Sequence, residues 1–374
     1  MSFEMTELVG TEFPLFAFSH CRNVVVAVSR AGGFGVLGGS GFTPESLEQE
    51  LKWIDEHVGG KSYGVDILIP ENQSLMFAAT TAEQLAAQIH EKHREFVVDL
   101  LGRYGISSNV ENTVSKSLPA TMPAVGEALL EVAFRHPIRL IANALGIAPR
   151  SMIEKARKQG VPVAALVGAK EHAVRQVKAG VDILVAQGGE AGGHCGEVST
   201  LVLVPEVLKA IRPIRKVPVL AAGGIMTGRQ MAACMAMGAA GAWTGSVWLS
   251  TAESETSPAF REKMIAAGSR DTVRVSSRTG KPCRQLRSAW HDAWESSDSP
   301  GVLPMPLMGM LSQPAFNKID KAVEGGNERA KALVSYFVGQ GVGLIDSVKS
   351  ASTVVQEFKE GFAEGVANLL TSIE

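Results

Sequence analysis

Short apolar runs alternate with amphipathic segments along the first two thirds of the chain. Each run has the length and β-branched content of a buried strand, and the segments between them have helical spacing. This alternation predicts a parallel α/β sheet. The runs are residues 13–18, 34–38, 62–70, 138–145, 161–168, 180–187, 217–224 and 239–246.

About eight strands thus precede Ser254, within the roughly 250 residues typical of a barrel of eight parallel strands. No antiparallel turn signature is evident among them. The count and the span favour a (β/α)8 TIM barrel over an open doubly wound sheet. Thr81 and Gln84 form a capping box that predicts a long helix to about Arg103. We expect residues from about 75 to 135 to be a helical excursion from the barrel.

The alternation stops at about Glu255, which predicts a barrel domain over residues 1–254 and a mainly helical lid or substrate region over residues 255–374. The Pro- and Met-rich run from Gly301 to Leu311 is not expected to form a regular helix. It is either a lid over the barrel mouth or a packed connection. Packing is favoured, because exposed apolar loops are uncommon without a partner.

Composition narrows the class of protein. The 374 residues are 45% hydrophobic and 20% charged, with a net charge of −2, as in an ordinary soluble globular protein. No basic face is indicated, so neither nucleic acid nor an anionic membrane is an expected partner. The four cysteines are too widely spaced for a zinc site and too few for a disulfide framework, and no metal site is predicted. With an acidic N-terminus and no bilayer-length apolar run, we expect a cytoplasmic protein.

One glycine motif is excluded by its context. Gly33, Gly35 and Gly38 match the GxGxxG pattern of dinucleotide-binding folds. That fingerprint requires a strand before the motif and a helix opening at its last glycine. Here the motif runs through the second predicted strand itself, so a dinucleotide fold is not indicated.

Chemistry is predicted at three glycine-rich turns that each follow a buried strand. The first, QGGEAGGHCG, spans residues 187–196 and presents His194; the others contain Gly223 and Gly224, and Gly245 and Ser246. In a TIM barrel the last two turns lie together at the usual phosphate site. Their backbone N–H groups, with the helix that begins near Thr227, could hold a phosphate without a lysine. The alternative is that these glycines only make tight turns.

These motifs resemble a known family. QGGEAGGHCGEVSTLVLVPEV, VPVLAAGGIMTGRQMAACMAMGA and AGAWTGSVWLSTAES are similar to the nitronate monooxygenases, formerly called 2-nitropropane dioxygenases. Related flavin barrels, the FMN-dependent enoyl reductases and the NADH:quinone reductases, share the motifs, which therefore identify FMN better than the substrate. The resemblance implies an FMN-dependent barrel with a helical region over the flavin.

The resemblance also implies roles for individual positions. His194 would be the catalytic histidine, although a histidine that only braces the glycine loop is the alternative. The residues that would contact FMN or surround its phosphate are Gln187, Gly192, Gly223, Gly224, Trp243, Thr244, Gly245 and Ser246. Cys21 and Cys195 have no evident basic partner and are expected to be packing residues.

The amino-terminal part departs from the family pattern. His20 and Cys21 follow the first strand where relatives usually have a glycine- and methionine-containing turn. His20 is either a second proton donor or a structural histidine. Asp66 stands where relatives commonly carry a flavin-contacting asparagine. If ionised, Asp66 would disfavour the electron-rich reduced flavin unless it bonds elsewhere or stays protonated.

The function implied is oxidation of an alkyl nitronate, or of a nitroalkane, by FMN and dioxygen to a carbonyl compound and nitrite. A nitronate carries negative charge that needs a positioned donor, and a nitroalkane needs a base to lose its α-proton; a histidine can serve both. NAD(P)H-dependent reduction of a quinone or enoyl thioester on the same flavin is the first alternative. A phosphate-ligand-binding barrel without turnover is the second. The sequence leaves the substrate range and the oligomeric state open.

Overall fold

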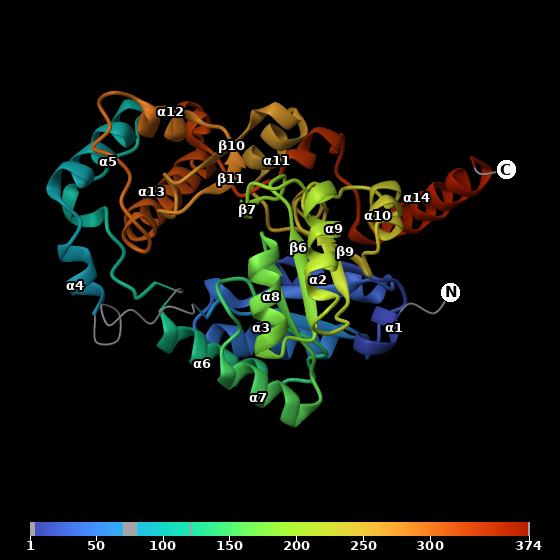
Figure 1. Ribbon diagram of the computed structural model, residues 1–374. Coiled ribbons are helices and arrows are strands. Elements are labelled where there is room, and N and C mark those ends of the chain that lie inside the picture. The colour runs from blue at the N-terminus through green and yellow to red at the C-terminus, as the bar shows by residue number, and fades with distance from the viewer. Residues whose placement is uncertain (1–3, 70–80, 120–121, 373–374) are drawn as a thin grey trace.

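The computed structural model describes residues 4–69, 81–119 and 122–372. Its centre is a closed barrel of eight parallel strands (Figure 1). In barrel order these are β1 (Leu15–Ser19), β2 (Phe34–Gly38), β3 (Tyr63–Asp66), β4 (Ile141–Asn143), β5 (Val163–Val167), β6 (Ile183–Gln187), β8 (Val219–Ala222) and β9 (Gly241–Thr244). The predicted TIM barrel is confirmed, and each of the eight apolar runs contains one strand.

The strands bury both faces, which explains why their sequences are continuously apolar rather than alternating. Successive side chains point to opposite faces. One set, including Phe16, Phe34, Val36, Val185 and Trp243, fills the barrel interior. The other set packs under the surrounding helices as part of the larger core.

Helices surround the barrel on its outside (Figure 1). They are α2 (Arg22–Arg30), α3 (Pro44–His57), α6 (Pro123–Ala133), α7 (Arg150–Gln159), α8 (Lys170–Ala179), α9 (Thr200–Ile211) and α10 (Gly228–Ala236). A short helix, α1 (Glu4–Val9), buries Met5 and Val9 against the interior cluster. No helix in the described ranges combines the length and the apolar content needed to cross a membrane.

The excursion between β3 and β4 differs from the predicted single helix. The capping box of Thr81 and Gln84 is present, but α4 (Ala82–Ala87) ends after six residues and α5 (Glu91–Arg103) begins after a break. His90 has extended backbone at this break. Both helices contact α13 (Leu307–Glu324), which the bend between them permits.

The region after β9 is less purely helical than predicted. It contains α11 (Pro258–Ile265), α12 (Ala289–Glu295), α13 and α14 (Ala351–Thr371). It also contains β10 (Thr272–Val275) and β11 (Cys283–Leu286), which pair antiparallel and extend to β7 (Gly193–His194) from the barrel part of the chain. The sequence analysis missed this sheet because its strands are short and polar.

The expectation that the Gly301–Leu311 run contains no regular helix is wrong for its last five residues, because α13 begins at Leu307. Prolines precede the helix at 304 and 306, where a missing N–H is tolerated, so they do not oppose it. Met308 and Leu311 are fully buried. The run is therefore a packed connection, as favoured, and not an exposed lid.

The rejection of the dinucleotide motif is confirmed. Gly35 and Gly38 lie within β2, and Gly38 is followed only by a short 3-10 helix, η1 (Gly39–Gly41), while the next α-helix, α3, begins at Pro44. A Cβ atom at Gly35 would lie 2.4 Å from the carbonyl oxygen of Val25 on α2. The motif thus serves close packing of a helix on a strand.

Candidate active site at the barrel mouth

The carboxyl ends of the barrel strands form a mouth that the region after β9 covers (Figure 1). The strands are buried along most of their length, whereas Gln187, Gly223, Gly224, Gly245 and Ser246, where three strands end, are partly exposed. Most of the predicted site residues lie on or directly after the neighbouring strands β6, β8 and β9, so the mouth brings them together. Strands β2 and β6 lie four strands apart in the closed order, on opposite walls of the barrel.

The loop that carries His194 is fixed by residues far away in sequence. Arg284 on β11 donates from Nε and Nη2 to the carbonyl oxygen of Gly189, at 3.0 and 2.8 Å. Arg274 on β10 donates from the same two atoms to the carbonyl oxygen of Cys195, at 3.2 Å each. His194 itself pairs with Cys283 across the small sheet. Sequence reasoning missed both arginines, because nothing in a single chain links them to the loop.

The hydrogen bonds around His194 assign its tautomer. Its Nε2 lies 2.8 Å from the hydroxyl of Thr279, and that hydroxyl donates to the carbonyl oxygen of Lys281 at 3.0 Å. Nε2 therefore carries the proton and donates to Thr279. This leaves the Nδ1 lone pair of the neutral ring without a partner in the described part of the chain. His194 is thus placed to accept a proton.

The protein around His194 favours that neutral form. His194 is an exposed residue, yet desolvation by the surrounding chain lowers the pKa of its ring to about 4. The positive charge of Lys281 acts in the same direction. Both effects disfavour the imidazolium ion. A neutral base at pH 7 is the expected state.

The arginine clamp on the glycine loop gives a first testable prediction. We expect Arg284→Ala to slow the reaction that depends on His194 by about tenfold, because the Gly189 carbonyl oxygen loses two charge-assisted hydrogen bonds. Arg284→Lys should recover only part of the rate, since an ammonium group lacks the rigid fork that directs two N–H groups at that one oxygen. Substrate turnover and circular dichroism of both variants are the measurements. If both variants fold and react at the wild-type rate, Arg284 does not position the loop that carries His194.

The two turns predicted to hold a phosphate offer backbone donors. The N–H groups of Gly224 and Gly245 donate to no other residue of the described chain. A Cβ at Gly245 would meet nothing within 4 Å, whereas Gly224 has φ +66° and a Cβ there would lie 3.1 Å from Glu190. Open space beside free N–H groups fits an anionic group.

Other predicted cofactor positions have roles in the fold itself. A Cβ at Gly192 would lie 2.8 Å from the Val338 backbone, and one at Gly223 would lie 2.6 Å from the hydroxyl of Thr200. Trp243 is buried in the barrel interior, where its ring stacks on Phe16 at 6.0 Å. These glycines and Trp243 are therefore explained by packing, whether or not a ligand also touches their backbone.

Thr244 and Ser246 likewise bond to the protein. Thr244 is buried and donates through its hydroxyl to the carbonyl oxygen of Phe16 at 3.0 Å. The Ser246 hydroxyl accepts from the N–H of Gly339 at 2.9 Å and so ties the covering region to the barrel. By contrast, Gln187 is partly exposed at the end of β6. Gln187 remains available to a ligand.

The helix end that we expected to assist a phosphate is occupied by protein. Thr227 and Gln230 cap α10 as predicted, and the Gln230 side chain also accepts from the N–H of Met226. A Cβ at Gly228 would lie 2.0 Å from the carbonyl oxygen of Phe358, so α14 packs directly on this first turn. The free backbone donors, rather than α10, are thus the features that fit an anion.

His20 and Asp66 lie on the wall of the mouth opposite His194. His20 Nδ1 donates to the carbonyl oxygen of Gly38 at 2.9 Å, which supports the structural reading of this residue but leaves Nε2 available. Asp66 is 3% exposed, and its Oδ1 has no hydrogen-bond partner. Burial raises the pKa of Asp66 to about 7.

The cysteines behave as packing residues. Cys21 is buried and Cys195 is half-buried. Burial raises the pKa of each thiol, which disfavours the thiolate. Within the described ranges, no group of three or more His, Cys, Asp or Glu residues could hold a metal ion.

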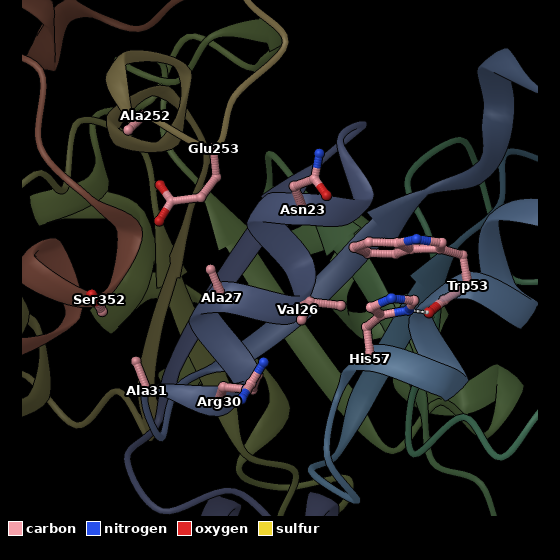
Figure 2. A pocket seen from close by; sticks show the side chains of 10 residues that line it. All are labelled: Asn23, Val26, Ala27, Arg30, Ala31, Trp53, His57, Ala252, Glu253 and Ser352. Carbon is pink, nitrogen blue, oxygen red and sulfur yellow. Dashed lines mark hydrogen bonds between the residues drawn. The ribbon is translucent and has the colours of Figure 1, made fainter.

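A separate groove of about 580 Å³ lies outside the barrel wall, between α2, α3 and the segments near Glu253 and Ser352 (Figure 2). Trp53 and His57 stack in parallel along one side of it, with ring centroids 4.0 Å apart. None of the predicted site residues lines this groove. It is distinct from the mouth.

Comparison with known proteins agrees with the motifs. The family model described as nitronate monooxygenase matches residues 4–361. A protein of Mycobacterium tuberculosis named "Putative monooxygenase" is 51% identical over 99% of this chain and 98% of its own length. A Staphylococcus saprophyticus protein named "Probable nitronate monooxygenase" is 27% identical over 85% of this chain and 88% of its own.

Solved structures share the architecture. Nitroalkane oxidase from Streptomyces ansochromogenes covers 98% of this chain, over 99% of its own, with a TM-score of 0.80 at 24% identity. FabK from Thermotoga maritima covers 100% of this chain, over 99% of its own, with a TM-score of 0.73 at 25% identity. The fold and the site thus define a TIM-barrel enzyme whose mouth carries glycine turns and a histidine. The chain belongs to the nitronate monooxygenase family, whose members are flavoproteins.

Proposed function

We propose that this protein is an FMN-dependent nitronate monooxygenase, which oxidises alkyl nitronates or nitroalkanes with dioxygen to a carbonyl compound and nitrite. The observation that carries the proposal is the neutral His194, held at the mouth with Nδ1 free. The family match supports the flavin, and the relatives named above support the substrate class.

The residues at the mouth fit FMN. The free N–H groups of Gly224 and Gly245 suit a terminal phosphate, and the open space at Gly245 leaves room for it. Gln187 and the unpartnered Asp66 offer polar groups for a flavin ring. When bound, FMN supplies the redox chemistry that no side chain provides.

His194 would act on the substrate. Its Nδ1 accepts the α-proton of a neutral nitroalkane, and a base whose pKa lies below the working pH is present in the required form. For a preformed nitronate no proton is removed, so its oxidation does not need Nδ1 as a base.

The cofactor assignment is tested on the purified protein. We expect it to be yellow and to release FMN, not FAD, on denaturation, because the two glycine turns suit one terminal phosphate. Chromatography of the supernatant identifies the flavin. Stoichiometric FAD, or no flavin after incubation with FMN, would overturn the assignment and favour a phosphate-ligand-binding barrel without turnover.

A further inference from the structure

The Asp66 side chain faces the barrel interior at the mouth. On β3 its neighbour Val65 packs in the outer core, so Asp66 shares the opposite face with Gly64. A Cβ at Gly64 would lie 3.0 Å from Phe34, a residue of the interior cluster. Asp66 lies two residues after Gly64, on the same face of β3 and nearer the carboxyl end of the strand. It therefore forms the upper layer of the interior, beneath whatever occupies the mouth.

Among the residues that the structure describes, no cation pairs with this carboxyl. The strands beside it, β2 and β4, carry no ionisable side chain, and neither does the glycine turn after β2. Tyr63, on β3, faces outward and donates to Asp55 at 2.6 Å. On the outer side, α2 contributes Arg22, which pairs with Glu50, and the exposed Arg30. Buried Oδ1 is left without a partner, a costly arrangement for a carboxylate.

His20 lies beside Asp66 along this wall. Gly38 of β2 is the register partner of Asp66, and neighbouring strands lie about 4.8 Å apart. A Cβ at Gly38 would lie 2.7 Å from the His20 ring, which places that ring over the adjacent position. Burial lowers the pKa of His20, so its ring is neutral near pH 7 and supplies no positive charge to Asp66. His20 therefore does not stabilise the ionised form of Asp66.

We propose that Asp66 contacts the bound flavin as a neutral carboxylic acid, so that the flavin is held tightly only while Asp66 keeps its proton. A protonated carboxyl offers one O–H donor and one carbonyl acceptor, the same pair that an asparagine amide offers. The ionised form offers acceptors only. At a pH below its pKa, Asp66 can thus take the place of the family's asparagine. At a pH above its pKa, the ionised carboxylate disfavours binding of the flavin. This inference rests on the proposed function, since it takes FMN as the ligand.

The test compares FMN affinity at pH 6.5 and pH 8.5 by fluorescence quenching. Wild-type protein should bind FMN about tenfold more weakly at pH 8.5, because binding must then first protonate Asp66. Asp66→Asn should lose this pH dependence. Any pH dependence that remains in this variant measures the contribution from titration of the FMN phosphate. Asp99→Asn, an exposed position on α5, is the matched control and should behave as wild type. Equal pH dependence in wild type and Asp66→Asn would overturn the proposal.

A second readout does not need the flavin. Infrared difference spectra of the purified protein between pH 5.5 and 8.5 should show one protonated carboxyl that ionises near pH 7 and is missing in Asp66→Asn. If Asp66 is ionised throughout this range, the inference fails even if FMN binds. If the carboxyl titrates as expected but no FMN binds, the proposed function fails instead. The two outcomes are therefore distinguishable.

Discussion

Replacing His194 by asparagine is expected to slow reduction of the bound flavin by a nitroalkane by about a hundredfold to ten-thousandfold, the usual effect of losing a positioned acid–base group. The flavin itself should be retained, because the N–H groups that we propose for the phosphate belong to Gly224 and Gly245, not to His194. The substitution should slow flavin reduction by a preformed nitronate less than reduction by the neutral nitroalkane, since only the nitroalkane needs Nδ1 as a base. Anaerobic stopped-flow reduction with each substrate is the measurement.

The pH profile gives His194 a second test. The base is neutral above its folded pKa, which burial and Lys281 depress to about 4. The rate with a nitroalkane should therefore stay level as the pH falls through 6.5, the ordinary histidine value, and decline only at lower pH. A rate that halves near pH 6.5 would contradict this assignment. Near wild-type reduction in a flavin-replete His194→Asn variant would return His194 to a bracing role and leave His20 as the candidate.

Gly245→Val is expected to lose most of its FMN while the protein stays folded. Gly245 has a negative φ, and a Cβ there meets no protein atom within 4 Å, so the valine fits the fold and occupies the space assigned to the phosphate. Gly224→Val should also lose the flavin, but its left-handed backbone adds strain that the first variant avoids. Flavin content per protein and thermal unfolding are the measurements.

The control for these variants is Gly102→Val on α5, where a Cβ also meets nothing within 4 Å and no left-handed backbone is required. It should keep both fold and flavin. Wild-type flavin occupancy in a folded Gly245→Val protein would show that this turn does not hold the phosphate. The glycines there would then serve the turn alone.

The barrel could be predicted because its strands are buried on both faces and its helices are capped locally. Continuous apolar runs and the capping boxes at Thr81 and Thr227 are visible in a few consecutive residues. The break between α4 and α5 has no such local signal, and the helices on both sides of it contact α13, more than two hundred residues later. Local signals thus locate most elements of the barrel but not bends set by distant packing.

The site could be predicted only in part, for the same reason. Glycine turns and His194 are local features of the sequence. The bonds from Arg274 and Arg284 to the loop, and from Gly339 to Ser246, join segments 79 to 95 residues apart. The missing hydrogen-bond partner of Asp66 Oδ1 could not be predicted from sequence either, because it depends on which side chains the neighbouring strands place beside it. The signal in the sequence was the resemblance to a family in which this position is expected to be asparagine.

The central claim, that nitronates reduce the enzyme's flavin, is tested most directly by anaerobic bleaching. Purified, FMN-replete protein is mixed without oxygen with an alkyl nitronate, or separately with NADH or NADPH, and the visible flavin absorption is followed. We expect the nitronate to bleach the flavin within seconds, and admission of oxygen to restore it with release of nitrite. Rapid bleaching by NADH or NADPH together with no response to any nitronate would contradict the proposed function and favour a reductase on the same barrel.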